Sequence, residues 1–443
     1  MTHHCRFCDA PLQHTFVDLG ASPLSNAFLE PTQLHQPEVH LPLRVYVCAS
    51  CLLVQLPEAE RPDAIFSDDY AYFSSYSDSW VQHAKAYVMH MQATYGIGPA
   101  DFVVEVASND GYLLRHFVDV GVPVLGIDPA QNVANAAEAV GVPTLPDFFG
   151  TSLARKVVQE RGHADLLIGN NVLAHVPDLN DFVEGLRLLL APEGLLTMEF
   201  PHLLRLIDEN QFDTIYHEHY SYFSLLAAER VFAAHGLTIV DVEELPTHGG
   251  SLRIYVRHTD AAPPVGERVE ALRNREQERG LDAVQTYVRF REHVHTVKRQ
   301  LLRFLLQARQ QNETVVGYGA PAKGNTLLNY CGVREDLLTY TVDRNPRKQG
   351  HWLPGTRIPI HAPEKILETK PDYVLVLPWN LKDEIVEQMQ DIAAWGGKFV
   401  VPIPTVRVLN PERKPRRDGC PTARPGDGSS ESSAPSTRAA ASH

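Results

Sequence analysis

The segment from Tyr216 to Tyr220 reads Tyr-His-Glu-His-Tyr and places two imidazoles, a carboxylate and two phenols in five consecutive residues. Imidazole is the side chain whose ordinary pKa lets it gain or lose a proton near neutral pH. A carboxylate or a phenol beside the ring can orient it or share the proton. So dense a set of polar groups is an unlikely way to build a core, and the segment predicts a proton-transfer site.

Upstream, residues 103–111 read Val-Val-Glu-Val-Ala-Ser-Asn-Asp-Gly, an apolar strand that ends in a turn of small residues. In doubly wound α/β folds, ligands bind at the carboxyl ends of strands, and an acid that ends the second strand, here Asp128, can hold a ribose diol. Only Gly111 remains of the three glycines of a dinucleotide turn, which weighs against the pyrophosphate of NAD. The pattern favours a ligand without a pyrophosphate, such as S-adenosylmethionine (SAM). The alternative is a plain strand-turn-helix of an α/β core.

The expected cofactor contacts follow the ends of successive strands. Phe148, directly after Asp147, is placed to stack on an adenine, with core packing as the equally weighted alternative. The candidate cofactor-binding residues are Glu105, Ala107, Ser108, Asn109, Gly111, Asp128, Asp147, Phe148 and Asn170.

Four of the six cysteines form two Cys-x-x-Cys pairs, Cys5 with Cys8 and Cys48 with Cys51. In a chain with no secretory signal, such pairs favour metal over disulfides. Four thiolates suit tetrahedral zinc and leave no open position for a substrate, so the expected zinc is structural. A redox dithiol and free thiols are the alternatives.

A second glycine-rich segment begins with Gly317 and Gly319 after an expected strand and continues to Lys323 and Asn325. It resembles an anion cradle at the N-terminus of a helix, where Lys323 could neutralise a diphosphate. Asp343 ends the next strand at a ribose-binding position. This half of the chain is therefore expected to be a second nucleotide-type fold, and the alternative is a vestigial cofactor fold used for packing.

The elements that position these residues alternate between strands and helices, which predicts an α/β protein with mostly parallel sheets. Two α/β units are expected, joined by a charged helical stretch over residues 266–310. Expected strands of the first unit are 102–107, 122–127, 164–169 and 195–200, and those of the second are 314–319, 338–342 and 372–377. The expected domains are a zinc-binding module at 1–65, Rossmann-like units at 66–262 and 263–410, and a disordered tail at 411–443.

Composition narrows the function classes. The net charge of −14 argues against a nucleic-acid partner, because such binding needs lysine and arginine to neutralise phosphates. No apolar run of 18 or more residues and no apolar signal core is found, so neither a membrane partner nor secretion is expected. A cytoplasmic protein is predicted, and the sequence carries no signal for an oligomeric state.

Several motifs in one order make the sequence resemble a known family. They are Glu105-x-x-Ser-Asn-Asp-Gly111, the two cysteine pairs, Tyr216-x-Glu218-His219, Gly249-Gly-Ser-Leu-Arg253 and the segment 317–326. Together they resemble the SAM-dependent sugar C-methyltransferases, which methylate C3 of nucleotide-linked 4-keto-deoxysugars. The resemblance extends to about residue 408. It implies an N-terminal zinc-binding domain, a SAM domain and a nucleotide-sugar substrate whose nucleotide binds the second glycine-rich fold.

The resemblance also implies a mechanism. A base removes the proton α to a ketone, and the resulting enolate attacks the methyl group of SAM. His219 is the base that the resemblance implies, with Tyr216 and Glu218 orienting it or the sugar. Tyr216 and His219 are neighbours if the segment forms a helical turn. His175, which follows a strand end, could reach the same pocket.

Three tyrosines near residue 70 could form a lid over the methyl donor or the sugar, as the resemblance implies. Their alternative role is to pack the following helix onto the domain. They are Tyr70, Tyr72 and Tyr76. Two other functions stay open from the sequence: a methyltransferase with an oxygen or nitrogen acceptor, and a non-catalytic or NAD-dependent nucleotide-binding protein.

Overall fold

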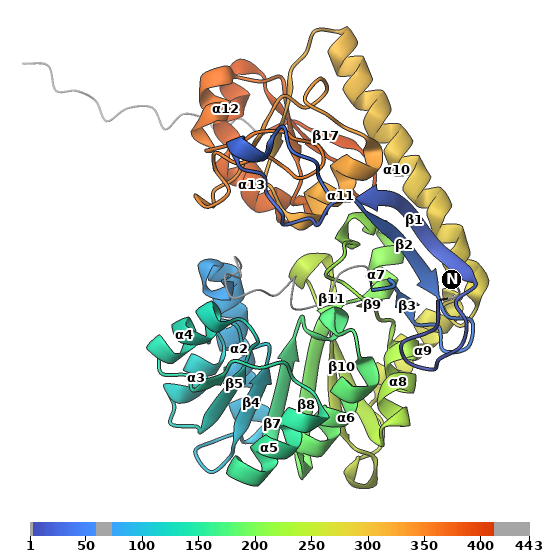
Figure 1. Cartoon of the computed structure of the whole chain (residues 1–443), viewed down its shortest axis with the longest axis vertical. Coiled ribbons are helices and arrows are strands. Elements are labelled where there is room, and N and C mark those ends of the chain that lie inside the picture. The colour runs from blue at the N-terminus through green and yellow to red at the C-terminus, as the bar shows by residue number, and fades with distance from the viewer. Residues whose placement is uncertain (1–2, 59–72, 412–443) are drawn as a thin grey trace, which may run out of the picture. The chain divides into compact units, whose positions relative to one another are not determined.

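The computed structural model describes residues 3–58 and 73–411, which three β-sheets organise (Figure 1). The N-terminal sheet is antiparallel, in the order β1-β2-β3-β9. Its strands are β1 (His14–Ser22), β2 (Leu41–Val47), β3 (Val54–Gln55) and β9 (Ser221–Tyr222). The first three come from the cysteine-bearing segment, whereas β9 directly follows the His-Glu-His segment. Gln55 pairs with Ser221 and Val54 with Tyr222, so the proton-transfer candidate is attached to this sheet.

The central sheet has the order β10-β11-β8-β7-β4-β5-β6. Its strands are β4 (Val103–Val106), β5 (Val124–Ile127), β6 (Thr144–Leu145), β7 (Ala164–Asn170), β8 (Leu190–Pro201), β10 (Leu237–Leu245) and β11 (Ser251–His258). The strands from β6 to β8 are parallel, and β11 is antiparallel to both of its neighbours. The four strands expected in the first α/β unit are thus confirmed as β4, β5, β7 and β8. The chain proceeds from β4 to one side and returns through β7 on the other, which makes the end of β4 a topological switch point.

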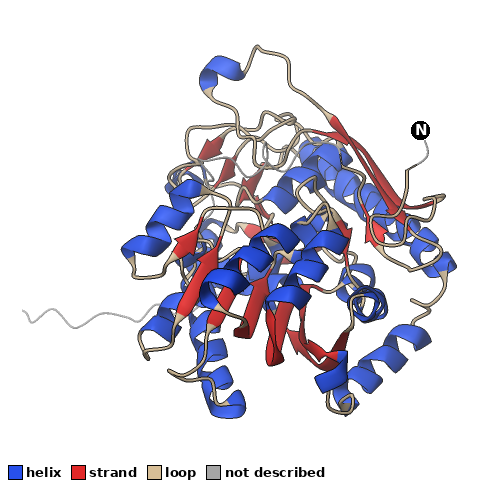
Figure 2. Cartoon of the chain, turned by 60° about the horizontal axis from the view of Figure 1, so that its bottom comes forward, coloured by secondary structure: helices blue, strands red, loops and turns tan. Residues whose placement is uncertain are grey.

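Helices flank the parallel strands (Figure 2). They are α2 (Asp78–Tyr95), α3 (Leu114–Val118), α4 (Gln131–Ala139), α5 (Thr151–Arg161), α6 (Leu179–Leu189), α7 (Leu203–Asp208) and α8 (Leu225–Ala234). Helix α2 begins after Ser77, whose hydroxyl accepts the N–H of Trp80, and ends at Gly96 with a left-handed φ of 72°. It buries Trp80, Ala84, Tyr87, Val88 and Met91, the spacing of one helix face.

The C-terminal sheet has the order β14-β13-β12-β15-β16-β17 and is parallel except for β17. Its strands are β12 (Val315–Tyr318), β13 (Thr341–Val342), β14 (Ile360–His361), β15 (Tyr373–Val376), β16 (Lys398–Val401) and β17 (Arg407–Leu409). Its helices are α11 (Ala322–Cys331), α12 (Glu364–Thr369) and α13 (Lys382–Gln388). The strands expected near 314, 338 and 372 are confirmed as β12, β13 and β15, with β13 limited to the last two residues of its predicted range.

The charged stretch before this sheet forms α9 (Glu267–Glu278) and the long helix α10 (Val284–Gln310). Helix α10 packs along β1 (Figure 1), where the rings of Phe290 and Phe16 stack with centroids 4.7 Å apart. No helix within residues 3–58 and 73–411 is long and apolar enough to cross a membrane. The expected tail at 411–443 lies outside the described residues, apart from Pro411.

Candidate functional site

The turn after β4 has an unusual backbone for its residue types. Ala107, Asn109 and Gly111 have φ values of 58°, 49° and 74°. A left-handed alanine is strained, and such strain clusters at ligand sites that the surrounding structure holds in place. The turn is held partly by the Asn109 side chain, whose Oδ1 accepts the N–H of Ser74 at 2.8 Å. The backbone here is therefore fixed in a shape that glycine-rich turns reach without strain.

The carboxylate of Glu105 is fully buried in β4. Neither of its oxygens has a donor in good hydrogen-bond geometry among the described residues, although the Tyr112 hydroxyl lies close enough to moderate its pKa. Burial raises the pKa of Glu105 well above its usual range. A buried carboxylate in this state gains from a cationic partner, and SAM carries an ammonium and a sulfonium. The residues present at the end of β4 thus fit SAM.

Other cofactor candidates follow the neighbouring strand ends. Val106 of β4 pairs with Ile127 of β5 and with Gly169 of β7, so Asp128 and Asn170 lie on either side of the β4 turn. Asp128 accepts the N–H groups of Asn109 and Ala130 at 3.0 and 3.1 Å. Burial raises the pKa of Asp128 to about 6. These strand ends form one edge of the sheet.

The remaining cofactor candidates differ in accessibility. Asn170 is buried and donates from Nδ2 to the Tyr112 hydroxyl at 3.3 Å. After β6, Asp147 is exposed, and Phe148 is 48% exposed, so its ring is available to a ligand. Ser108 is fully buried against Gly126 of β5, where a Cβ would meet the serine hydroxyl at 2.4 Å. The Ser108 hydroxyl therefore faces the sheet.

Residues 216–219 form a turn that lies outside any helix, so the helical turn considered for Tyr216 and His219 is not formed. The His219 N–H donates to the Tyr216 carbonyl at 3.0 Å, which closes this turn. Tyr216 and His219 are still in contact, since their ring centroids lie 4.1 Å apart. Directly before it stands a short 3₁₀ helix, Phe212–Thr214, which supplies the partner of the histidine.

His219 is 8% exposed, and its Nδ1 lies 3.0 Å from the carbonyl oxygen of Thr214. A carbonyl only accepts, so Nδ1 carries the proton and Nε2 carries the lone pair. The His175 ring lies 4.7 Å away, centroid to centroid. Burial lowers the pKa of His219 well below its ordinary value, and that of His175 to about 4. Both rings are neutral near pH 7, and the lone pair of His219 lies at Nε2.

Side chains of the segment 217–220 point in different directions. His217 points its Nε2 to the Leu41 carbonyl at 3.3 Å, and the Arg6 guanidinium lies 5.3 Å from the Tyr220 ring centroid. These contacts attach the segment to the cysteine-bearing part of the chain. The carboxylate of Glu218 accepts a hydrogen bond from Asn26 Nδ2 at 2.7 Å, and burial raises its pKa. Asn26 lies in no recognisable motif and was not predicted.

The C-terminal candidates also occupy different surroundings. Asn325 donates from Nδ2 to the Ser25 carbonyl at 2.5 Å and is buried, and Asp343 accepts the N–H of Ala320 at 2.7 Å. Lys323 donates to Asn380 Oδ1 at 2.8 Å. The two glycines have packing roles as well. A Cβ placed on Gly317 would meet Thr341 Oγ1 at 2.5 Å. A Cβ placed on Gly319, whose φ is 87°, would meet Pro378 at 2.6 Å.

Of the lid candidates, Tyr76 is 69% exposed, and Tyr70 and Tyr72 lie outside the described residues.

The four paired cysteines converge, with all four Sγ atoms within 4.8 Å of one another. Both pairs adopt the same loop: the residue after the second cysteine, Asp9 or Leu52, has φ of 58° or 66° and donates its N–H to the first cysteine's carbonyl. Sulfurs around tetrahedral zinc at about 2.3 Å lie about 3.8 Å apart. The Cys5–Cys51 and Cys8–Cys48 Sγ distances are both 3.5 Å, so the donor set fits the ion.

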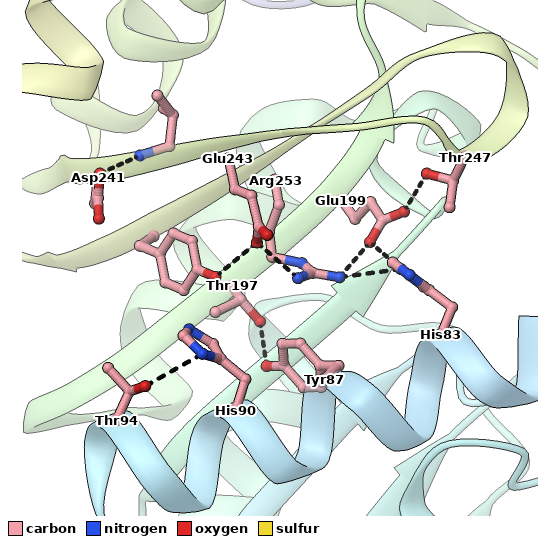
Figure 3. Close-up of polar contacts among 12 residues, drawn as sticks. His83, Tyr87, His90, Thr94, Thr197, Glu199, Asp241, Glu243, Thr247 and Arg253 are labelled. Atoms are coloured by element: carbon pink, nitrogen blue, oxygen red, sulfur yellow. Dashed lines mark hydrogen bonds and ion pairs between the residues drawn. The ribbon is translucent and has the colours of Figure 1, made fainter.

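A buried polar cluster joins α2, β8 and β11 beside the site (Figure 3). The Glu199 carboxylate is fully buried and meets Arg253 Nη2 at 2.7 Å, His83 Nε2 at 2.9 Å and the Thr247 hydroxyl at 2.8 Å. Burial opposes its ionisation, but the hydrogen bond with His83 and the charge of Arg253 lower the pKa of Glu199 to about 2. The cluster holds Thr247 and thereby the following turn that carries His248.

This chain is 37% identical over 408 residues to the C-methyltransferase NovU of Streptomyces niveus, an alignment that covers 92% of this chain and 97% of NovU. It belongs to the C-methyltransferase family. Family models match a zinc binding domain at residues 5–66, a methyltransferase domain at 86–242 and a C-methyltransferase C-terminal domain at 246–404.

Two further similarities are more limited. A ubiquinone biosynthesis O-methyltransferase of Bartonella tribocorum is 26% identical over 95 residues, or 21% of this chain and 38% of that enzyme. Among solved structures, the magnesium protoporphyrin IX methyltransferase ChlM of Synechocystis PCC 6803 with bound SAM is 17% identical, covering 44% of this chain and 88% of that one, with a TM-score of 0.32. Neither similarity adds to the family assignment.

As a C-methyltransferase, the chain is a SAM-dependent transferase with a zinc-binding N-terminal domain, as the sequence predicted. SAM supplies an electrophilic methyl group when bound, and zinc would be held by Cys5, Cys8, Cys48 and Cys51. Family membership supports carbon methylation over the oxygen, nitrogen and NAD-dependent alternatives.

The cluster around Glu199 leads to a prediction about the stability of this C-methyltransferase. In an Arg253→Met variant, Glu199 keeps a buried negative charge without its guanidinium partner, so unfolding free energy should fall by about 3–5 kcal/mol. Urea unfolding at neutral pH measures the change. Arg257→Met is the matched control on the same strand, because Arg257 donates to the carbonyl of the exposed Glu193 and not to a buried carboxylate. It should cost less than about 1 kcal/mol, and equal losses in both variants would contradict the prediction.

Proposed function

We propose that this C-methyltransferase acts on a nucleotide-linked keto-deoxysugar and methylates the carbon adjacent to the ketone. A carbon acceptor, unlike an oxygen or a nitrogen, has no lone pair to offer, so a C–H bond must first be broken. Removing a proton α to a ketone is the accessible way to do so, because the carbonyl takes up the negative charge. The observation that carries the proposal is the neutral, enclosed His219 ring with Nε2 ready to accept that proton.

In the proposed reaction, the α-proton moves to Nε2 of His219. The C–H electron pair becomes the C=C bond of an enolate, and the carbonyl π pair moves to oxygen. The enolate carbon then bonds to the methyl carbon as the S–CH₃ bond breaks. Nδ1 keeps its hydrogen bond to Thr214, so the imidazolium that forms is oriented and partly stabilised.

The neighbours of His219 have supporting roles in this proposal. Tyr216 lies against the ring and can position it or donate to the sugar, and His175 lines the opposite side. Glu218 is held by Asn26, so its part is to fix the turn and orient His219. The proposed cofactor contacts are those at the ends of β4, β5, β6 and β7, with Glu105 facing the cationic methionyl portion and Phe148 the adenine.

The nucleotide is proposed to bind the C-terminal sheet near its switch point, at the end of β12 between β13 and β15, with its ribose rather than its diphosphate against Asp343. Asp343 repeats the arrangement of Asp128, since each ends a second strand and accepts an N–H from the turn after the first. The proposed domains are residues 1–65, 66–262 and 263–410, and Tyr76 is proposed to cover the acceptor.

Hydrogen exchange tests this function. The enzyme is incubated in D₂O with S-adenosylhomocysteine and each of a panel of nucleotide-linked 4-keto-deoxysugars. Enolisation should replace the α-hydrogen of the true substrate with deuterium, which NMR detects at that carbon. The same sugar with SAM should gain one methyl group on that carbon. Methylation without α-exchange would exclude the proposed base mechanism, and methylation of none of the sugars would exclude the substrate class.

A further inference from the structure

Lys323 belongs to a polar cluster that the proposed reaction has not yet used. Its side chain extends from the first turn of α11 and remains half-buried. Nζ donates to Asn380 Oδ1 at 2.8 Å and lies 4.6 Å from the Trp379 ring centroid. The Trp379 indole in turn donates from Nε1 to Asp213 Oδ2 at 2.7 Å, and Asp213 is fully buried. The ammonium is thus held between an amide, an indole face and a distant carboxylate.

This cluster adjoins the turn that holds the proposed base. Asp213 directly precedes Thr214, whose carbonyl orients Nδ1 of His219. The Thr326 hydroxyl donates to the Ile215 carbonyl at 2.9 Å, which fixes α11 against the same segment. Lys323 is one helical turn before Thr326 and is therefore directed from α11 to the region of His219.

A second contact places His248 around the same cluster. The Trp379 ring lies against Gly249, where a Cβ would meet Cη2 at 2.7 Å, so only glycine fits beside the indole. His248 precedes it with a strained φ of 54°, and its Nε2 lies 3.1 Å from Asn171 Nδ2 at the end of β7. Trp379 therefore links Lys323, which it contacts, to Gly249 directly after His248, and α11 packs on the segment that leads to His219.

The electrostatics agree with this geometry. Burial is the main cause that lowers the pKa of His219 and of His248, and the positive charge of Lys323 contributes to both. The groups that face His219 are His175, His248 and Lys323, with Tyr216 and Tyr222 in ring contact. Of these groups, the Lys323 ammonium carries the positive charge.

The turn before α11 is poorly suited to the diphosphate that the sequence suggested for Lys323. The N–H of Ala320 is already taken by the carboxylate of Asp343, which puts a negative charge where a phosphate would approach. The Lys348 ammonium is engaged there as well, since it donates to the Ala320 carbonyl at 2.9 Å. Lys323 is directed to the histidines, away from the contacts that a phosphate at this turn would need.

We propose that the Lys323 ammonium stabilises the oxygen of the enolate that forms when His219 removes the α-proton. This inference rests on the proposed enolisation and assigns Lys323 to the ketone instead of the diphosphate. His219 is a weak base, so proton transfer from the sugar to His219 is unfavourable unless the enolate is stabilised. A cation already positioned at the enolate oxygen supplies that stabilisation. Lys323 keeps its own proton throughout. Its positive charge disfavours the imidazolium form of His219, but the same charge stabilises the negative enolate oxygen beside it.

The test compares Lys323→Met and Lys323→Gln with Lys382→Met, a matched control that removes a partly exposed lysine paired with Asp383. The substrate is the nucleotide-linked 4-keto-deoxysugar that the wild-type enzyme methylates. Both Lys323 variants should lose about 10²- to 10³-fold in kcat and in α-deuterium exchange with S-adenosylhomocysteine, the loss typical of removing one oxyanion donor. KM for the sugar should stay within a few-fold, and the acid limb of the pH profile should move to higher pH because the charge that lowers the pKa of His219 is gone.

Each other outcome decides against the inference. A large rise in KM with unchanged exchange at saturation would show that Lys323 binds the phosphates. Equal losses in Lys382→Met would show a general charge effect. If the wild-type enzyme itself shows no exchange, enolisation fails and this inference fails with it. If Lys323→Met does not fold by its thermal midpoint, Lys323→Gln, which keeps a donor for Asn380, carries the comparison.

Discussion

We expect the His219→Gln variant to lose methyl transfer by about 10²- to 10⁴-fold in kcat, the range that a positioned general base contributes. Glutamine has a similar volume but no nitrogen lone pair that can take up the α-proton. SAM binding, measured by calorimetry, should remain within a few-fold, because the cofactor candidates lie at the strand ends around β4. The α-hydrogen exchange of the sugar in D₂O should fall in parallel with kcat.

The same segment offers a matched control. His217 is two residues away but points to the Leu41 carbonyl, so His217→Gln should keep kcat within a few-fold of the wild-type value. Full turnover in His219→Gln, or an equal loss in His217→Gln, would remove His219 from the mechanism. The pH profile adds a second readout. Because the pKa of His219 is lowered, the neutral ring predominates at pH 7, and the acid limb of kcat should lie below the ordinary histidine value of about 6.5.

Loss of a zinc ligand should have the second large effect. In a Cys48→Ser variant, we expect metal analysis to show zinc falling well below one ion per chain and the thermal midpoint to drop. Structural zinc contributes about 10–16 kcal/mol in isolated zinc-finger peptides. A loss of even about 4 kcal/mol corresponds to a fall of about 8–16 °C in the thermal midpoint of a domain of about 150–250 residues.

This change should also reduce activity. Asn26 lies between the two cysteine pairs in the sequence and holds Glu218, and β3 follows the second pair and carries β9. Cys331→Ala is the control, since Cys331 is a buried thiol outside the cluster. It should retain zinc and stay within a few degrees of the wild-type midpoint. A Cys48→Ser variant with full zinc content and an unchanged midpoint would contradict the structural role.

The parts of the fold that local patterns encode were predictable. The apolar strand that leads to Gly111, the strands on both sides of it and the paired cysteines are each specified within a few residues. The edge of the sheet where Asp128 and Asn170 flank the β4 turn follows from parallel pairing, and it was also predicted. The left-handed backbone at Ala107 was not, because alanine there carries no residue signal; neighbouring contacts impose it.

The division of the His-Glu-His segment depends on contacts with distant parts of the chain. Nothing in five adjacent residues indicates that His219 turns to His175 while His217 turns to Leu41. The partner of Glu218 comes from residue 26, and the direction of Lys323 depends on Trp379 and Thr326. Sequence spacing predicted a chemical role for His219 and Lys323, but only tertiary packing decides which side chains they contact.

Strand β9 links the fold to the order in which the chain is made. The N-terminal sheet can form β1, β2 and β3 as soon as the first cysteine-rich segment leaves the ribosome, but its edge at β3 has no partner until residue 222 has been synthesised. Domains generally fold as units during synthesis, starting from the N-terminus. Here the edge of β3 stays unpaired until the segment that carries the proposed base and β9 has been synthesised. The pairing of β3 with β9 therefore requires the nascent chain to complete this sheet with the segment that carries the proposed base.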